Sequence, residues 1–224
     1  MNFSKEWDER YKQNTQMSIW PWSDLVSYVM RYSRPSSPGF KVLELGCGAG
    51  ANIPFFRYLG VEYYAIEGSE TIVESLWGRY PELRNNIIIG DITEAIPFAG
   101  QFDLVVDRSS LTHNSSAAIK GSLSHVSNRL KPRCKYIGID WFGTLHSDYR
   151  NGDPGEDEYT RSNYKKGQFA RVGRVHFSDK SHLEELFSDF EIEIMELKTI
   201  RREIPEDRHI FASWNLVARK REEE

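Results

Sequence analysis

Short apolar runs alternate with segments of helical period from residue 40 onward, and this alternation is the main structural signal of the sequence. Runs typical of buried strands lie at 41–45, 61–66, 86–89, 102–107 and 134–141. Helical patterns lie between them at 51–59, at 69–79 after the N-cap candidate Ser69, and at 115–130. Regular alternation of strand and helix predicts a parallel sheet with right-handed crossovers and helices on both faces. We therefore expect a doubly wound α/β fold.

The pattern changes on both sides of this alternating region. Residues 1–39 read as a helical cap with helices at 3–12 and 22–33, and residues 142–178, rich in Gly, Tyr, Asp, Arg and Lys, have no sustained apolar period. We expect 142–178 to be a lid or acceptor-binding insertion, with a solvated loop as the alternative. A helix is then expected at 179–188 and strands at 191–197 and 210–218, followed by a solvated tail at 220–224. With Pro205 between them and no helix, the two late strands predict an antiparallel hairpin at one sheet edge.

The composition is that of an ordinary globular protein. The chain has 224 residues, 39% hydrophobic and 28% charged residues and a net charge of −4, which fits a single domain and gives no reason to expect a nucleic acid partner. The first residues are acidic where a signal peptide needs an apolar core, and no run is long enough to span a bilayer, so we expect a cytoplasmic protein without membrane contact. Cys47 and Cys134 have no CxxC or Cys/His pattern, so we expect reduced thiols and no metal.

Three alternate glycines directly follow the first strand. Gly46, Gly48 and Gly50 come after Val42–Leu45 and before a helix. Glycines at such a turn let the backbone fold back, leave room for a ligand against the main chain, and aim the free N–H groups of the next helix at it. The segment therefore predicts a cofactor-binding turn.

Three acidic positions extend this signal. Glu44 lies two residues before Gly46, Glu67 ends the second strand, and Asp91 follows the third. In this order the residues resemble the class I S-adenosylmethionine-dependent methyltransferases over about 40–140, and the order of predicted elements is also similar to that family. The resemblance implies a Rossmann-like, mostly parallel sheet of seven strands with an antiparallel last strand, and S-adenosylmethionine as cofactor. It implies cofactor binding by Glu44, Gly46, Cys47, Gly48, Gly50, Glu67, Gly68, Asp91, Ile92 and Asp107.

Physical chemistry gives the acids separate roles. Glu67 can accept hydrogen bonds from both ribose hydroxyls, and Asp91 can accept from the adenine amine while Ile92 packs on the ring. Glu44 can fix the ammonium group of the methionine part or only buttress the loop. The alternatives are an ordinary strand-end acid for Glu67 and turn chemistry for Asp91.

Catalytic candidates lie in the loop after the fourth strand, at 107–114. His113 is the candidate base because imidazole titrates near neutrality, and Asp107 is a second candidate. The alternatives are that His113 only precedes a helix starting at Ser115 with Asn114 as its cap, and that Asp107 pairs with Arg108. The loop lacks the Asn/Asp-Pro-Pro-aromatic motif of methyltransferases that act on nucleic acid bases, so we expect a small-molecule acceptor, with O-methylation slightly favoured over N-methylation.

Two other functions remain open from the sequence. Residues 46–51 also satisfy GxGxxA, which fits an NAD-dependent oxidoreductase, and a non-catalytic nucleoside-binding module would keep the same pocket. The sequence does not indicate an oligomeric state. The aromatic residues Trp7, Tyr11, Trp20 and Trp22 either cap the cofactor or form a helical core. His176 either points into an acceptor cavity or is a buried, hydrogen-bonded histidine.

Overall fold

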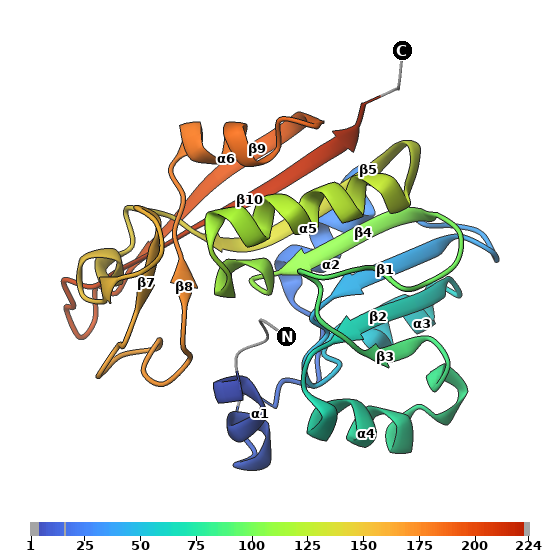
Figure 1. Cartoon of the computed structure of the whole chain (residues 1–224), viewed down its shortest axis with the longest axis horizontal. Helices are drawn as coiled ribbons and strands as arrows, with labels where there is room; N and C mark the ends of the chain where they lie inside the picture. The colour runs from blue at the N-terminus through green and yellow to red at the C-terminus, as the bar shows by residue number, and fades with distance from the viewer. Residues whose placement is uncertain (1–4, 16, 222–224) are drawn as a thin grey trace.

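The computed structural model describes residues 5–15 and 17–221, and their central element is a seven-stranded sheet with the order β3-β2-β1-β4-β5-β10-β9 (Figure 1). Its strands are β1 (Lys41–Leu45), β2 (Glu62–Glu67), β3 (Ile87–Ile89), β4 (Phe102–Arg108), β5 (Leu130–Phe142), β9 (Phe190–Arg201) and β10 (Ile210–Lys220). Strand β1 pairs in parallel with both β2 and β4, so the chain reverses its direction of winding beside β1. In open α/β sheets, ligands bind at the carboxyl ends of the strands at this point.

The expected antiparallel closure is confirmed. Strand β10 runs antiparallel to both β5 and β9, and is inserted between them. The sheet is therefore the mostly parallel, seven-stranded, Rossmann-like one that the resemblance implies.

Helices cover both faces of the sheet, as the alternation predicts. The helices are α1 (Lys5–Lys12), α2 (Ser23–Tyr32), α3 (Ile53–Tyr58), α4 (Glu70–Arg79), α5 (Ser116–Arg129) and α6 (Lys180–Leu186). Apolar residues of α2, α3 and α4 form one core cluster with the sheet, and those of α5 and α6 form a second cluster with its other face. Figure 1 shows α5 in front of the central strands. The Ser69 hydroxyl caps α4 by accepting from the backbone N–H of Ile72, as expected.

Several predicted ends differ from the observed ones. Residues 3 and 4, where the first helix is expected to start, lie outside the described residues. The same is true of residues 222–224 in the expected tail. The interpretation of Lys220 as tail is wrong, because β10 extends to this residue and its ammonium group donates to the backbone carbonyl of Leu130 (3.2 Å). Long cross-strand pairing with β9 keeps the polar end of β10 in the sheet.

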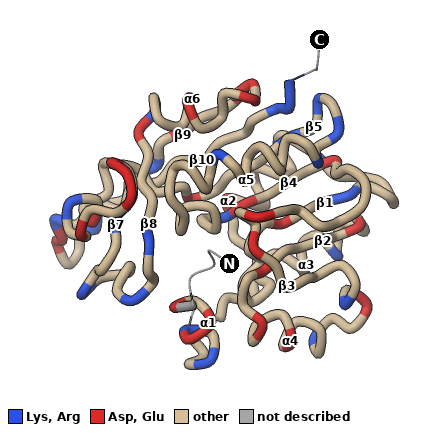
Figure 2. Tube along the Cα trace, viewed as in Figure 1, with Lys and Arg blue, Asp and Glu red and all other residues tan. Residues whose placement is uncertain are grey.

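Residues 142–178 form a folded insertion beyond the carboxyl end of β5 (Figure 1). It contains a 3-10 turn, η3 (Ser147–Arg150), and an antiparallel sheet of β6 (Asp153–Pro154), β7 (Thr160–Ser162) and β8 (Val175–His176). Its own apolar cluster consists of Phe142, Tyr164, Phe169, Val172, Val175 and Phe177. The solvated-loop alternative is therefore wrong: dispersed aromatic residues meet in space although they follow no period in the sequence. Acidic and basic positions both occur along this insertion (Figure 2).

His176 lies in this insertion with 1% of its surface exposed. Its ring nitrogens lie 3.3 Å from the hydroxyl of Thr160 and 3.2 Å from Nε2 of His182. The interpretation as a buried, hydrogen-bonded histidine is confirmed. Within 5–15 and 17–221, no helix has the length and apolar character needed to cross a membrane.

Candidate cofactor and active site

The glycine turn leaves β1 with a backbone that only glycine adopts easily. Gly46 has φ +66°, and a Cβ there would lie 2.0 Å from the hydroxyl oxygen of Ser110. Gly48 has φ +50°, and a Cβ there would lie 2.9 Å from the hydroxyl oxygen of Tyr11. Missing side chains at both positions let the loop after β4 and helix α1 approach the turn. The turn thus forms the floor of a cavity.

Glu67 is fixed beside this turn at the end of β2. One carboxylate oxygen, Oε2, accepts from the backbone N–H of Gly48 (2.8 Å), and Oε1 accepts from that of Ser69 (3.0 Å). Only 5% of the residue is exposed, and burial raises the pKa of its carboxyl group although the backbone donors oppose the shift. Each oxygen keeps acceptor capacity beyond its backbone bond. The carboxylate therefore presents a rigid acceptor pair at the cavity wall.

Glu44 and Asp91 line the same cavity with different surroundings. The Glu44 carboxylate accepts from Nδ2 of Asn52 (2.7 Å) and from the hydroxyl of Tyr63 (2.6 Å), and burial raises its pKa to about 7. These bonds tie β1 to the start of α3, as the buttress interpretation requires. Asp91 accepts from the backbone N–H (2.9 Å) and hydroxyl (2.7 Å) of Thr93, which fixes its carboxylate at the end of β3.

Eight of the ten expected cofactor-binding residues line this single cavity. They are Glu44, Gly46, Cys47, Gly48, Glu67, Gly68, Asp91 and Ile92. Gly50 and Asp107 are not part of the lining. Gly50 instead allows close packing, because a Cβ there would lie 2.7 Å from Leu76.

Asp107 lies behind the cavity wall with none of its surface exposed. Oδ1 accepts from the backbone N–H groups of Ser110 (2.9 Å) and Leu111 (3.3 Å), and Oδ2 accepts from the side chains of Trp141 (2.7 Å) and Tyr136 (3.1 Å). Burial raises its pKa to about 6. The structure therefore corrects the expectation of direct contact with cofactor or acceptor: four donors use this carboxylate to shape the loop after β4. The alternative that Asp107 pairs with Arg108 is also wrong, because Arg108 forms its ion pair with Asp140, with 3.1 Å between nitrogen and oxygen.

His113 belongs to the cavity lining, at the end of the 3-10 turn η2 (Leu111–His113). Its Nδ1 lies 2.9 Å from the backbone carbonyl of Arg174. Because a carbonyl only accepts, Nδ1 carries the proton and Nε2 holds the lone pair. Burial lowers the pKa of His113 to about 4, so the ring is neutral at pH 7. Asn114 does not cap α5; Ser115 does, by accepting from the backbone N–H of Ala118.

The sequence comparison shows which family the central part of the chain is similar to. Residues 42–133 match the family model described as "Methyltransferase domain". This part of the chain is therefore similar to the methyltransferase family. The match runs from β1 into β5 and includes the glycine turn, Glu67 and Asp91. No curated protein matches the sequence.

Solved structures share the fold of the methyltransferase domain. A methyltransferase from Methanosarcina mazei, described as SAM-dependent, has a TM-score of 0.68 at 16% identity, covering 91% of this chain and 100% of the other. The 1,6-didemethyltoxoflavin-N1-methyltransferase of Burkholderia thailandensis has a TM-score of 0.65 at 16% identity, covering 97% and 85%. Magnesium protoporphyrin IX methyltransferase of Synechocystis has a TM-score of 0.58 at 18% identity, covering 88% and 80%.

The residues of the cavity fit S-adenosylmethionine, the cofactor that the sequence resemblance implies. The buried Glu67 oxygens suit a vicinal diol, Asp91 with Ile92 suits an adenine ring with its amine, and the glycine floor leaves room for the chain of the methionine part. The carboxyl groups of Glu44, Glu67 and Asp91 also line a site for a cationic sulfonium, and a bound cation would favour their charged forms.

The four N-terminal aromatic residues that the sequence offers as cofactor caps differ in their positions. Trp7, Tyr11 and Trp22 of the N-terminal cap line the cavity, whereas Trp20 is 73% exposed. The guanidinium carbon of Arg108 lies 3.5 Å from the Trp22 ring centroid, so the two close one side of the site. The Arg108–Trp22 contact joins segments far apart in the sequence, so no local pattern predicts it.

Proposed function

We propose that this methyltransferase domain methylates a small molecule, with a hydroxyl acceptor slightly favoured over an amine. The observation that carries the proposal is a neutral His113 in the wall of the cavity that also holds Glu67 and the glycine turn. A net charge of −4 and three carboxylates in the cavity wall disfavour a polyanionic acceptor such as nucleic acid.

The residues divide the work between holding and proton transfer. When bound, S-adenosylmethionine would supply an electrophilic methyl group, with the neutral thioether sulfur as the leaving group. Glu67 and Asp91 hold the nucleoside, and the fixed geometry lowers the entropic part of the barrier. Nε2 of His113 makes no hydrogen bond to any described residue and takes the proton of an acceptor hydroxyl. A neutral amine has its own lone pair and needs no such base.

The insertion supports this role through His113. The backbone carbonyl of Arg174 fixes the His113 tautomer, and the side chain of Arg10 donates to the backbone carbonyl of Ala170, which ties α1 to the insertion. No insertion residue among those described lines the cavity itself. We therefore propose that the insertion orients the base and borders the acceptor side, acting as a lid only at that margin.

The test is transfer of a carbon-13-labelled methyl group from S-adenosylmethionine to compounds of a metabolite extract, detected by mass spectrometry and NMR. A labelled product whose methyl carbon resonates in the O-methyl region supports the proposal, and an N-methyl product contradicts the preference for oxygen. Tight cofactor binding without transfer to any compound would favour a non-catalytic module.

His113→Ala tests the base. It should lower kcat by roughly 100-fold or more and leave the affinity for S-adenosylhomocysteine nearly unchanged, because the cofactor groups lie on other strands. His125→Ala, on α5 and outside the cavity lining, is the matched control. The rate of the unaltered enzyme should fall at low pH only near the His113 pKa of about 4. An unaltered kcat in His113→Ala would remove this residue from the chemistry.

A further inference from the structure

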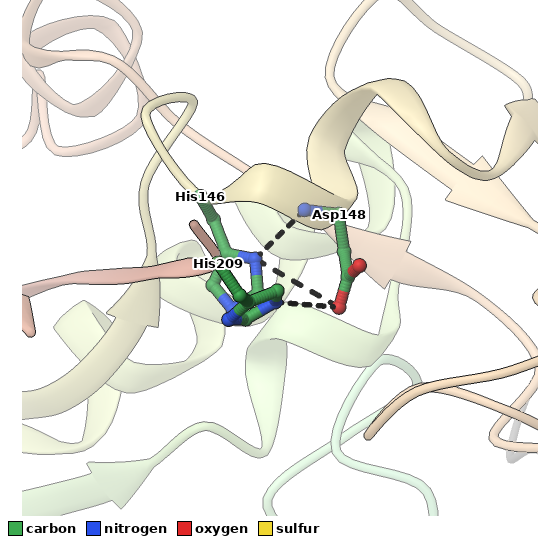
Figure 3. A group of neighbouring side chains, drawn as sticks. All are labelled: His146, Asp148 and His209. Atoms are coloured by element: carbon green, nitrogen blue, oxygen red, sulfur yellow. Dashed lines mark hydrogen bonds and ion pairs between the residues drawn. The ribbon is translucent and has the colours of Figure 1, made fainter. Parts of the chain in front are cut away.

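Two histidines and an aspartate converge outside the cofactor cavity. His146 and Asp148 lie at the start of η3 in the insertion, and His209 lies just before β10 (Figure 3). One ligand atom from each lies within 4.8 Å of the other two. These segments are more than 60 positions apart in the sequence, so only the folded chain assembles the group.

The hydrogen bonds show which atoms face the centre of the group. The backbone N–H of Asp148 donates to Nδ1 of His146 (3.0 Å), so Nδ1 is unprotonated and Nε2 carries the hydrogen. This Nδ1 lies 4.0 Å from Oδ2 of Asp148, and the same Oδ2 lies 3.4 Å from Nε2 of His209. A cation bound between them would replace the Asp148 N–H as the partner of the Nδ1 lone pair and would need an unprotonated Nε2 on His209.

Two of the three ligand-atom distances approach those of a transition-metal site, and the third lies within 4.8 Å. Zinc bonds to nitrogen and carboxylate oxygen of about 2.0–2.2 Å in a tetrahedron place neighbouring ligand atoms roughly 3.4 Å apart. The Asp148–His209 distance already has this value, and the His146–Asp148 distance must shorten by about half an ångström. His209 has 37% of its side chain exposed at the end of a loop and can make the larger adjustment.

The surroundings hold the ligands in place. Asn151 donates to Oδ1 of Asp148 (3.0 Å), which leaves Oδ2 for an ion. The side-chain amide of Gln168 lies 3.1 Å from Nε2 of His146. With this amide rotated by 180°, its oxygen accepts the hydrogen that Nε2 carries. Such outer partners orient metal-binding side chains. The His146 ring also packs against Phe142, Phe169, Phe177 and Phe211, which exclude water from one side.

We propose that His146, Asp148 and His209 bind a divalent transition-metal ion such as Zn²⁺, with water completing the coordination. The ion joins the insertion to the β9–β10 connection, next to the bond from the backbone N–H of Ile210 to the Ser147 hydroxyl (2.8 Å). The site is a structural clamp, since none of its residues lines the cofactor cavity.

The test is titration of untagged, chelator-treated full-length protein with Co²⁺, followed by its visible d–d absorption, and with Zn²⁺, followed by the melting temperature. We expect one tetrahedral Co²⁺ per chain, and a Tm rise of roughly 5–10 °C when Zn²⁺ is present at about 100 times its Kd. His209→Ala should weaken binding by more than about tenfold, and His125→Ala should leave it unchanged.

Three results would overturn the proposal. These are no saturable binding, binding that His209→Ala leaves unaffected, or loss of binding in His182→Ala instead, which would place the metal at the buried His176–His182 pair. Asp148→Asn, which keeps the shape of the side chain, is the second ligand variant should His209→Ala be poorly folded. Because the readout is metal binding and not methylation, failure here leaves the proposed function untouched.

Discussion

Glu67→Gln removes the negative charge from a carboxylate whose two oxygens already accept the backbone N–H groups of Gly48 and Ser69. Hydrogen bonds to a charged acceptor contribute about 1.5–3 kcal/mol, roughly twice the neutral value. Two ribose hydroxyls bonded to a neutral amide therefore lose roughly 1.5–3 kcal/mol together. At about 1.4 kcal/mol for each factor of ten, S-adenosylhomocysteine should bind roughly 10- to 150-fold more weakly.

Isothermal titration calorimetry with S-adenosylhomocysteine measures this loss. Glu62→Gln is the matched control, because Glu62 begins the same strand with its side chain 45% exposed, away from the cavity lining. In Glu67→Gln the amide NH2 group takes the place of one oxygen and faces a backbone N–H, so one hydrogen bond of the turn is lost. Circular dichroism must therefore show that the variant is folded. A folded Glu67→Gln protein whose affinity is within about twofold of the unaltered chain, well outside the range above, would refute the diol-binding role.

Two further variants test packing and protonation. Gly46→Ala should lower the free energy of unfolding by roughly 2–5 kcal/mol, because strain at positive φ adds to a clash with Ser110. Gly60→Ala is the control: Gly60 has φ +67° and a Cβ there would have nothing within 4 Å, so this variant should show the backbone strain alone. Equal losses measured by urea unfolding would contradict the Ser110 contact. Burial lowers the pKa of His176 to about 3, so below pH 6.5 this histidine is protonated in the unfolded chain but not in the folded one. His176 should therefore lower the free energy of unfolding by about 1.4 kcal/mol per pH unit as pH falls from 6.5 toward 3. The raised pKa values of Glu44 and Asp107 favour the folded state as pH falls, which opposes the effect of His176. The quantity to measure is therefore the difference in the free energy of unfolding between the unaltered chain and His176→Gln, at pH 7 and at pH 5. A difference that does not change with pH would contradict the lowered pKa of His176.

The sheet and the cofactor residues are predictable because their signals are local. Buried parallel strands need continuous apolar runs, and a ligand at their carboxyl ends meets residues at strand ends, so Glu67 and Asp91 can be located by counting. The antiparallel end of the sheet follows from two strand patterns without a helix between them. These features depend on neighbours within a few residues.

The remaining features depend on contacts that join distant segments. Asp107 stands at a strand end like Glu67, but Trp141 and Tyr136 of β5 bury it and use its oxygens, which sequence spacing does not show. The insertion has a core only because aromatic residues such as Phe142 and Phe177 meet across its small sheet. The His146 cluster needs the connection before β10 to fold back onto η3.

Calorimetric titration of the purified chain with S-adenosylhomocysteine and with NAD shows directly whether the glycine turn and Glu67 form a site for S-adenosylmethionine. We expect saturable binding of S-adenosylhomocysteine at one site and no detectable heat of binding for NAD. Binding of NAD with none of S-adenosylhomocysteine would contradict it and assign the cavity to a dinucleotide.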